Sequence, residues 1–525
     1  MTVSDVAVGG TGAARQAPRR PAPARRLTGG VLLVALVSCA PVLTTRYGYV
    51  DDYTLLFDDA RGRDVTSLGL AQGRPVAALL QWPLLLVIDG VSGLVALRLI
   101  SVLSFAAMGV LLGRTMLSRG YSTAAAWTVA VGLFAIPSTG IMVAWSILYF
   151  GALAALAAAA AAVLAVDPRE RPGSRPFLAA VVRRRTFVAM VLLSLAMLSY
   201  QPSAMVFWPC AFLMLAAPGR RPGWRGLVLP VWTTVVVGLA ALVAGYVAVK
   251  AGALLSDLSI SRTDLVTDPV NKVGFLLSEV VPLAMFPWLL DVRLVAAVVV
   301  AAALAAGLLL TLPGTKVDRL VMTALAGAAV VLGWLANLPI AENAPYARTS
   351  IGVMVAVVVV VGVVVEGVLS RAGSRVGARL IPPTTMVVVA LLALAWMPYV
   401  LTTYVTSPAS TELRRVEDVV RRLPSARPVT VLTAEPGTTL APRTVADEFG
   451  RSTGAVYWAL QAITELAYRD AHGDWPEPGR LSYPTDADYT GGRLREVPDE
   501  GWVLDYQQVL APEQGPALYD VSRAP

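Results

Sequence analysis

Apolar and polar stretches alternate along the chain with the spacing of a polytopic helical membrane protein. About eleven apolar stretches are separated by polar loops, and most approach the ~20 residues that an α-helix needs to cross a membrane. We therefore expect an all-α membrane domain over residues 27–405. The predicted spans cover residues 27–46, 93–112, 124–142, 145–166, 187–201, 203–217, 227–249, 293–312, 320–340, 350–369 and 382–404.

Arginine-rich loops alternate with loops that contain few basic residues. The positive-inside rule places the arginine-rich loops in the cytoplasm. Residues 1–26, rich in Ala, Pro, Gly and Arg, predict a disordered cytoplasmic arm. The odd number of spans then places the C-terminus outside the cytoplasm. The arginines that mark the cytoplasmic side include Arg25, Arg26, Arg183, Arg184, Arg185, Arg220, Arg221, Arg371, Arg375 and Arg379.

Three longer segments are expected on the outer face: the loops 47–93 and 250–291, and the C-terminal residues 406–525. In the first loop, residues 53–71 suit a helix on the membrane surface, and residues 75–88 suit an interfacial or re-entrant helix. The C-terminal segment has a strand-like run at 429–433 and a helical pattern at 456–467. It predicts a small extracytoplasmic α/β domain.

Composition supports this class. The 525 residues are 56% hydrophobic and 15% charged, with a mean hydropathy of +0.65, which excludes an ordinary soluble domain. The net charge of +8 lies in short clusters between apolar stretches. Topology accounts for this charge, so no nucleic-acid partner is expected.

Cysteine and histidine are scarce. Cys39 and Cys210 both lie in apolar runs, which excludes a disulfide framework and a thiolate metal cluster. His472 is the single histidine, so a histidine-based metal site or catalytic triad is excluded. Residues Leu36 to Cys39 also match a lipoprotein cleavage site, but we prefer an uncleaved first helix.

Two adjacent acids, Asp51 and Asp52, follow the first predicted span at its outer end. One interpretation is a solvated loop whose acids cap the next helix. The other is a functional carboxylate pair at the membrane surface.

Basic and aromatic residues also gather at the predicted outer level. Arginine suits phosphate because its planar fork donates two hydrogen bonds, so the outer cations indicate a pocket for an anionic lipid head group. Pairing with nearby acids is the alternative for any one of them. The aromatic and amide residues suit a sugar site, and the alternative for the tryptophans is an interfacial aromatic belt. The cations include Arg74, Arg262 and Arg348, and the other group includes Tyr53, Trp145, Tyr200, Gln201 and Tyr346.

Five short motifs occur in order: Asp51-Asp52-Tyr53, Gln72 to Pro75, Arg98 to Ser101, Tyr200-Gln201-Pro202 and Tyr346-Ala347-Arg348. Together, over residues 30–405, they resemble the O-antigen glucosyltransferase II family, within the GT-C class of membrane glycosyltransferases. The C-terminal domain lies outside this resemblance.

The resemblance implies transfer of a hexose, with glucose favoured, from a polyprenyl-phosphate donor to a cell-envelope glycan or lipid-linked saccharide on the outer face. It implies that Asp51 or Asp52 removes the acceptor proton, with Asp52 slightly favoured, and that Arg74, Arg348 and Arg262 bind the donor phosphate. Tyr53, Trp145, Tyr200, Gln201 and Tyr346 would bind sugar or acceptor. No cofactor is expected, and a divalent cation is left open.

Two other functions fit part of the pattern. A flippase or transporter of a lipid-linked saccharide would share the cations and aromatic residues, but it favours ionisable residues at mid-membrane. Apart from Arg98, the predicted spans are largely free of charge. A noncatalytic subunit for polymer assembly is the third interpretation.

Overall fold

The computed structural model describes the chain in twelve stretches. They are residues 22–88, 90–166, 183–218, 224–255, 265–285, 294–343, 346–372, 376–423, 427–435, 438–441, 452–483 and 501–521, the last without residue 515.

The first half of the membrane domain is entirely helical. Its elements are α1 (Ala22–Ser38), α2 (Ala40–Thr44), α3 (Asp51–Ala60), α4 (Ser67–Ala71), α5 (Pro75–Leu85), α6 (Gly90–Ser118), α7 (Thr123–Gly132), η1 (Leu133–Ala135), α8 (Pro137–Ala144), η2 (Ser146–Leu148), α9 (Tyr149–Ala165), α11 (Arg184–Ser199), α12 (Gln201–Ala204) and α13 (Phe207–Leu215).

The second half continues the bundle. Its elements are η3 (Trp224–Leu227), α14 (Val228–Leu255), α15 (Pro269–Phe275), η5 (Leu276–Val280), α16 (Val281–Met285), α17 (Leu294–Thr311), α18 (Lys316–Leu332), η6 (Leu335–Asn337), η7 (Ala347–Ser350), α19 (Ile351–Ala372), α20 (Val376–Leu391), η8 (Leu392–Trp396), α21 (Met397–Leu401) and η9 (Thr402–Thr406).

Each predicted span coincides with a helix or a broken pair of helices, but the count of eleven is not confirmed. Within the described residues, six helices are long and apolar enough to cross a membrane, and a seventh span results if Thr123–Ala135 and Pro137–Ala144 are counted together. That pair is bent by 52°. The bend follows from Pro137, because the residue before a proline is pushed out of the helical region, and Ile136 is extended.

The remaining four predicted spans correspond to shorter helices. α1 and α18 have 17 residues each and α11 has 16, so each is shorter than the ~20 residues of a typical crossing. The fourth, predicted at 203–217, corresponds to α12 and α13. Hydropathy locates these helices correctly and does not fix their ends.

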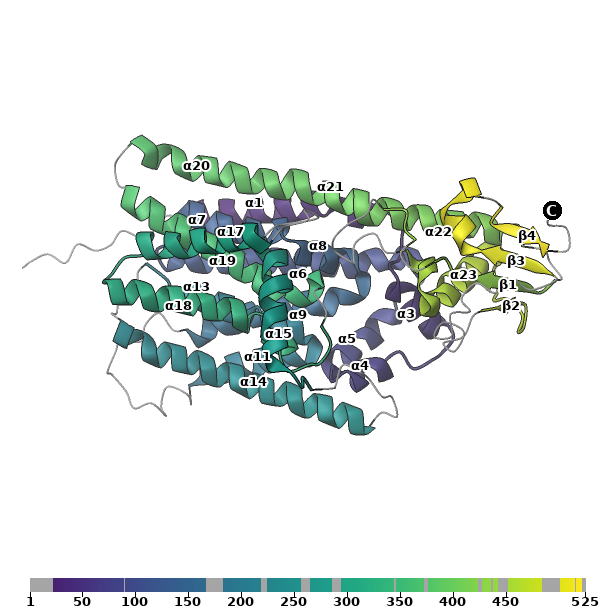
Figure 1. Cartoon of the computed structure of the whole chain (residues 1–525), viewed down its shortest axis with the longest axis horizontal. Coiled ribbons are helices and arrows are strands. Elements are labelled where there is room, and N and C mark those ends of the chain that lie inside the picture. Colours follow the sequence, from purple (N-terminus) through teal and green to yellow (C-terminus); the bar gives the residue numbers. More distant parts are fainter. Residues whose placement is uncertain are drawn as a thin grey trace, which may run out of the picture.

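A continuous helix of 39 residues, Pro382–Val420, joins the membrane domain to the C-terminal domain. It contains most of α20, then η8, α21, η9 and α22 (Ser407–Val420), and both η8 and η9 are π-helical. Its length of about 58 Å exceeds the thickness of a bilayer core. Figure 1 shows it running along one side of the bundle to the sheet. The predicted domain boundary after residue 405 falls inside this helix.

The C-terminal α/β domain is present as predicted. Its four-stranded sheet has the order β2-β1-β3-β4, with β1 parallel to β2 and β3, and β3 antiparallel to β4. The helices α22, α23 and α25 pack together or against β1. The remaining elements are β1 (Val429–Leu432), η10 (Thr453–Ala455), α23 (Tyr457–His472), β2 (Leu481–Ser482), β3 (Trp502–Asp505), α25 (Tyr506–Leu510), η11 (Pro512–Gln514) and β4 (Leu518–Asp520).

The loop 47–93, which the sequence predicts to be outer and which is called the first outer loop below, folds into α3, α4 and α5 between the two domains (Figure 1). The prediction of a single surface helix over 53–71 is wrong, because the helix α3 ends before the loop that leads to α4. In this loop Asp64 accepts hydrogen bonds from the backbone N–H and the hydroxyl of Thr66. Such a local side-chain bond competes with helix formation. α5 has 11 residues, about 16 Å, which is too short for a crossing.

Candidate functional site

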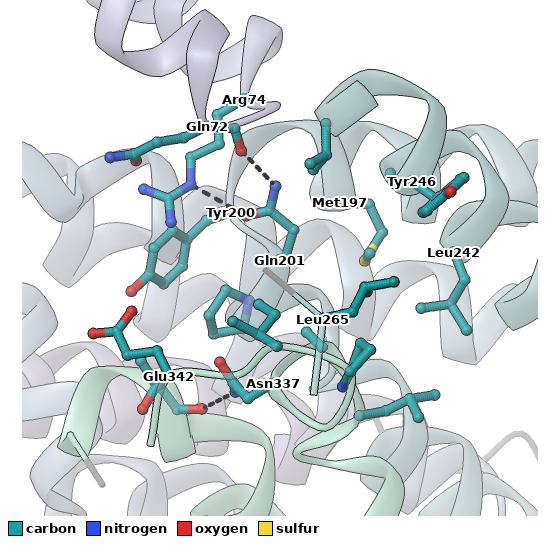
Figure 2. Close-up of a pocket in the computed structure, with 18 of the residues that line it drawn as sticks. Gln72, Arg74, Met197, Tyr200, Gln201, Leu242, Tyr246, Leu265, Asn337 and Glu342 are labelled. Atoms are coloured by element: carbon teal, nitrogen blue, oxygen red, sulfur yellow. Dashed lines mark hydrogen bonds between the residues drawn. The ribbon is translucent and has the colours of Figure 1, made fainter. Parts of the chain in front are cut away.

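A cavity of about 380 Å³ lies where the first outer loop meets α11, α12, α14 and the segment after α18. Figure 2 shows Gln72, Arg74, Tyr200 and Gln201 on one side of it, and Met197, Leu242 and Tyr246 on the other. The lining also includes Lys250, Leu265, Leu335, Ala336, Asn337, Ile340, Glu342, Tyr346, Arg348 and Thr349. The cavity therefore has a polar end and an apolar end.

Gln201 fixes the turn that carries Arg74. Tyr200 is extended and α12 begins at Gln201, with Pro202 as its second residue. The Gln201 side-chain amide donates to the carbonyl oxygens of Gln72 and Gly73, each at 3.3 Å, and its oxygen accepts from Arg74 Nε at 3.1 Å. The Arg74 guanidinium also lies 4.8 Å from the centre of the Tyr200 ring. Arg74 is thus held in a defined position on the cavity wall.

Close backbone approach at two glycines brings this turn against α14. Gly73 has φ of +68°, and a Cβ there would lie 2.5 Å from Val249 Cγ2. A Cβ on Gly252 would lie 2.1 Å from the carbonyl oxygen of Leu70. Position 73 requires a left-handed backbone conformation and a close contact with Val249 of α14, and only glycine allows both.

Arg348, in η7, lines the cavity and contacts the aromatic rings of Trp145 and Tyr346. Its guanidinium lies 4.5 Å from the Trp145 ring centre and 5.2 Å from that of Tyr346. Trp145 in turn contacts Tyr49 edge to face, with ring centroids 5.3 Å apart. Trp145 is buried and supports Arg348 from behind the cavity wall.

Asp52 lies fully buried at the base of this loop. Its Oδ2 accepts from the backbone N–H groups of Tyr49 at 3.0 Å and Ser146 at 3.3 Å, and its Oδ1 accepts from that of Ile147 at 2.9 Å. Arg98 Nη2 lies 4.0 Å from Oδ2. Burial raises the pKa of Asp52 to about 6, although Arg98 and the backbone donors oppose the rise. These contacts fasten the loop to the membrane domain.

Asp51 and Tyr53 face different partners. Asp51 is half-buried and accepts a hydrogen bond from Trp458 Nε1, on α23, at 3.1 Å. The Tyr53 hydroxyl accepts from the backbone N–H of Gly48 at 3.0 Å, and its ring is buried against that glycine. The two adjacent acids therefore connect α3 to two different domains.

The structure brings five of the predicted site residues together on the cavity: Arg74, Arg348, Tyr200, Gln201 and Tyr346. Asp51, Asp52, Tyr53 and Trp145 do not line it, and Arg262 lies outside the described residues. Sequence reasoning missed Glu342 and Asn337 as lining residues. The available signal was an acid and amides at the outer end of a span, beside Tyr346.

Within the described residues, no group of three or more His, Cys, Asp or Glu side chains is placed to hold a metal ion. The fold and the cavity define a polytopic helical membrane protein with an anion-suited pocket beside its first outer loop.

No family model matches the sequence, and no curated protein matches it. The resemblance to O-antigen glucosyltransferase II therefore stays a prediction from the motifs. The chain is similar to two crystal structures of ArnT from Cupriavidus metallidurans, one bound to undecaprenyl phosphate and one in the apo state. Each has 12% sequence identity and a TM-score of 0.41, and each match covers 93% of this chain and 94% of the other.

Proposed function

We propose that the protein is a GT-C-type membrane glycosyltransferase that transfers a hexose, with glucose favoured, from a polyprenyl-phosphate donor. The acceptor is a cell-envelope glycan or a lipid-linked saccharide. One observation carries the proposal: a single cavity combines Arg74 and Arg348 with aromatic and amide side chains at one end and an apolar wall at the other. That combination suits a lipid phosphate that carries a sugar.

Each part of the donor has a matching part of the cavity. Arg74 and Arg348 bind the phosphate, because a guanidinium donates two parallel hydrogen bonds to phosphate oxygens. Tyr200, Gln201 and Asn337 contact the sugar ring and its hydroxyls.

The polyprenyl chain lies along the apolar wall formed by Met197, Leu242 and Val249. Leu242 and Val249 belong to α14, and Leu239, Val243 and Val247 are exposed on a neighbouring face of the same helix, as expected for a helix that faces lipid. A donor can therefore enter the cavity from the bilayer without crossing water.

In the proposed reaction, the acceptor hydroxyl oxygen attacks the anomeric carbon of the donor. The bond between that carbon and the phosphate oxygen breaks, and polyprenyl phosphate leaves with the electron pair, stabilised by the arginines. A carboxylate of the Asp51 and Asp52 pair takes the hydroxyl proton. Neither acid lines the cavity, so the base role rests on the resemblance of the sequence motifs; because three backbone donors hold Asp52, we assign it to anchoring the loop and assign the base role to Asp51.

We place the cavity and the C-terminal domain on the outer face. Figure 1 shows the end of α19 and the start of α20 at the end of the bundle opposite the sheet. Arg371 is in the last turn of α19, and Lys316 and Arg319 are at the start of α18. Arg371 donates to the carbonyl of Leu312 at 3.4 Å, which joins the ends of two helices there. The positive-inside rule assigns this end to the cytoplasm.

The test is a transfer assay with purified protein in lipid nanodiscs, polyprenyl phosphate carrying a labelled hexose, and cell-envelope acceptor. We expect the label to move from lipid to acceptor, and the Arg74→Ala and Arg348→Ala double variant to lose this transfer. In a parallel proteoliposome assay, label that crosses the bilayer but stays on the lipid would assign the protein as a flippase and refute the transferase.

A further inference from the structure

We infer that Glu342 binds the hydroxyl groups of the donor sugar and thereby distinguishes the loaded lipid from bare polyprenyl phosphate. This inference rests on the proposed function and adds a specificity-determining residue to it. The ligand class is a hexose with free neighbouring hydroxyls.

Glu342 is the single carboxylate among the described residues that line the cavity, where Arg74, Arg348 and Lys250 also lie. Figure 2 shows it on the same side as Gln72, Arg74 and Tyr200, away from Leu242 and Tyr246. It therefore lies at the polar end, where the sugar is expected.

The backbone that presents Glu342 is held by hydrogen bonds from Lys272. Lys272 Nζ donates to the carbonyl oxygen of Glu342 at 2.6 Å and to Asn343 Oδ1 at 2.9 Å. Lys272 is only 2% exposed, and its ammonium lies 5.2 Å from the ring centre of Trp334, which is fully buried. A buried cation thus anchors this segment of the cavity wall through its main chain.

The chemistry of a carboxylate explains the selectivity. Its two oxygens accept hydrogen bonds from two neighbouring hydroxyls, and hydrogen bonds to a charged group are stronger than neutral ones. The same negative charge disfavours a phosphate dianion. Once the sugar has been transferred, the remaining polyprenyl phosphate loses its bonds to Glu342 and keeps only the repulsion, which favours release of the product.

The test compares the affinity of two ligands, polyprenyl-phosphate hexose and polyprenyl phosphate, for wild-type protein and Glu342→Gln in nanodiscs. We expect Glu342→Gln to weaken binding of the sugar-bearing lipid by about 10- to 100-fold. Binding of the bare lipid should be unchanged or tighter. The control is Glu279→Gln, because Glu279 is exposed in η5 and does not line the cavity, and it should change neither affinity.

Three outcomes separate the possibilities. If Glu342→Gln changes both affinities equally, Glu342 only tunes the arginines and the inference is wrong. If wild-type protein binds the loaded lipid no better than the bare lipid, the inference is also wrong, and this result needs no variant. If wild-type protein neither binds these lipids nor transfers the hexose, the proposed function itself fails.

Discussion

Replacement of Gly252 by alanine should weaken donor use although Gly252 does not line the cavity. A Cβ at this position lies 2.1 Å from the Leu70 carbonyl oxygen, whereas ordinary contacts begin at 3.4 Å. The backbone of α4 and the end of α14 must therefore separate by about 1.3 Å. Because Gln72 to Arg74 follow α4 directly, this separation moves Arg74 relative to the rest of the cavity.

Two effects of opposite sign contribute to the stability of Gly252→Ala. Alanine in place of a helical glycine stabilises by roughly 0.5 to 1 kcal/mol, but overpacking a close contact costs roughly 1 to 3 kcal/mol. The overpacking term is the larger, so Gly252→Ala should be less stable than wild type. A displacement of this size at a positioned group costs up to about 100-fold in catalytic efficiency.

The matched control is Gly274→Ala in α15, where a Cβ meets no atom within 4 Å. At this position only the stabilisation from replacing a helical glycine by alanine remains. The melting temperature of Gly274→Ala should therefore equal or exceed that of wild type. Thermal unfolding in nanodiscs and the donor dependence of hexose transfer would be measured for both variants. If Gly252→Ala matches Gly274→Ala in both measurements, the packing of the first outer loop on α14 does not position Arg74.

Three further predictions concern charged groups. Arg74→Ala should raise the donor KM by roughly 10- to 100-fold and Arg74→Lys should be intermediate, since lysine keeps the charge but loses the fork; an unchanged donor dependence in both would move the phosphate site elsewhere. Asp51→Asn should lower turnover by about 100- to 10,000-fold at an unchanged melting temperature, and wild-type turnover would remove its role as base. Because burial raises the pKa of Asp52 to about 6 from an ordinary 3.8, the folded protein binds this proton more tightly than the unfolded chain, so the free energy of unfolding should fall as the pH rises from about 4 to 6. Melting temperatures across this range should lose that dependence in Asp52→Asn, and the same slope in both proteins would contradict the assignment.

Much of the fold was predictable because hydropathy depends on local composition. The positions of the helices, the strand Val429–Leu432 and the helix Tyr457–His472 follow from periodicity. Their ends depend on features that hydropathy averages out, such as the bend before Pro137. For this reason the predicted count of eleven spans is not confirmed within the described residues, where six or seven helices have the length and composition of a crossing.

The candidate site was predictable in part. Arg74, Gln201 and Arg348 stood out because polar groups at the outer ends of spans need partners, and the structure places them on one cavity. The opposed surroundings of Asp51 and Asp52 were not predictable, because they depend on Trp458 in another domain and on backbone donors about 95 residues away. Glu342 was missed because its local signal, an acid beside amides and Tyr346 at the end of a predicted span, is common in loops and does not specify a cavity.

Because one continuous helix of 39 residues joins the two domains, the number of residues in this helix sets the orientation of the C-terminal domain relative to the membrane domain. One residue inserted near Ser407 would rotate everything beyond it by about 100° and advance it by about 1.5 Å. Trp458 and Glu465, which bond to Asp51 and Arg61 across the interface, would then face away from α3. A flexible linker would absorb such an insertion, but a continuous helix transmits it. The angular phase of this helix, and not only its length, decides whether the C-terminal domain can meet the first outer loop.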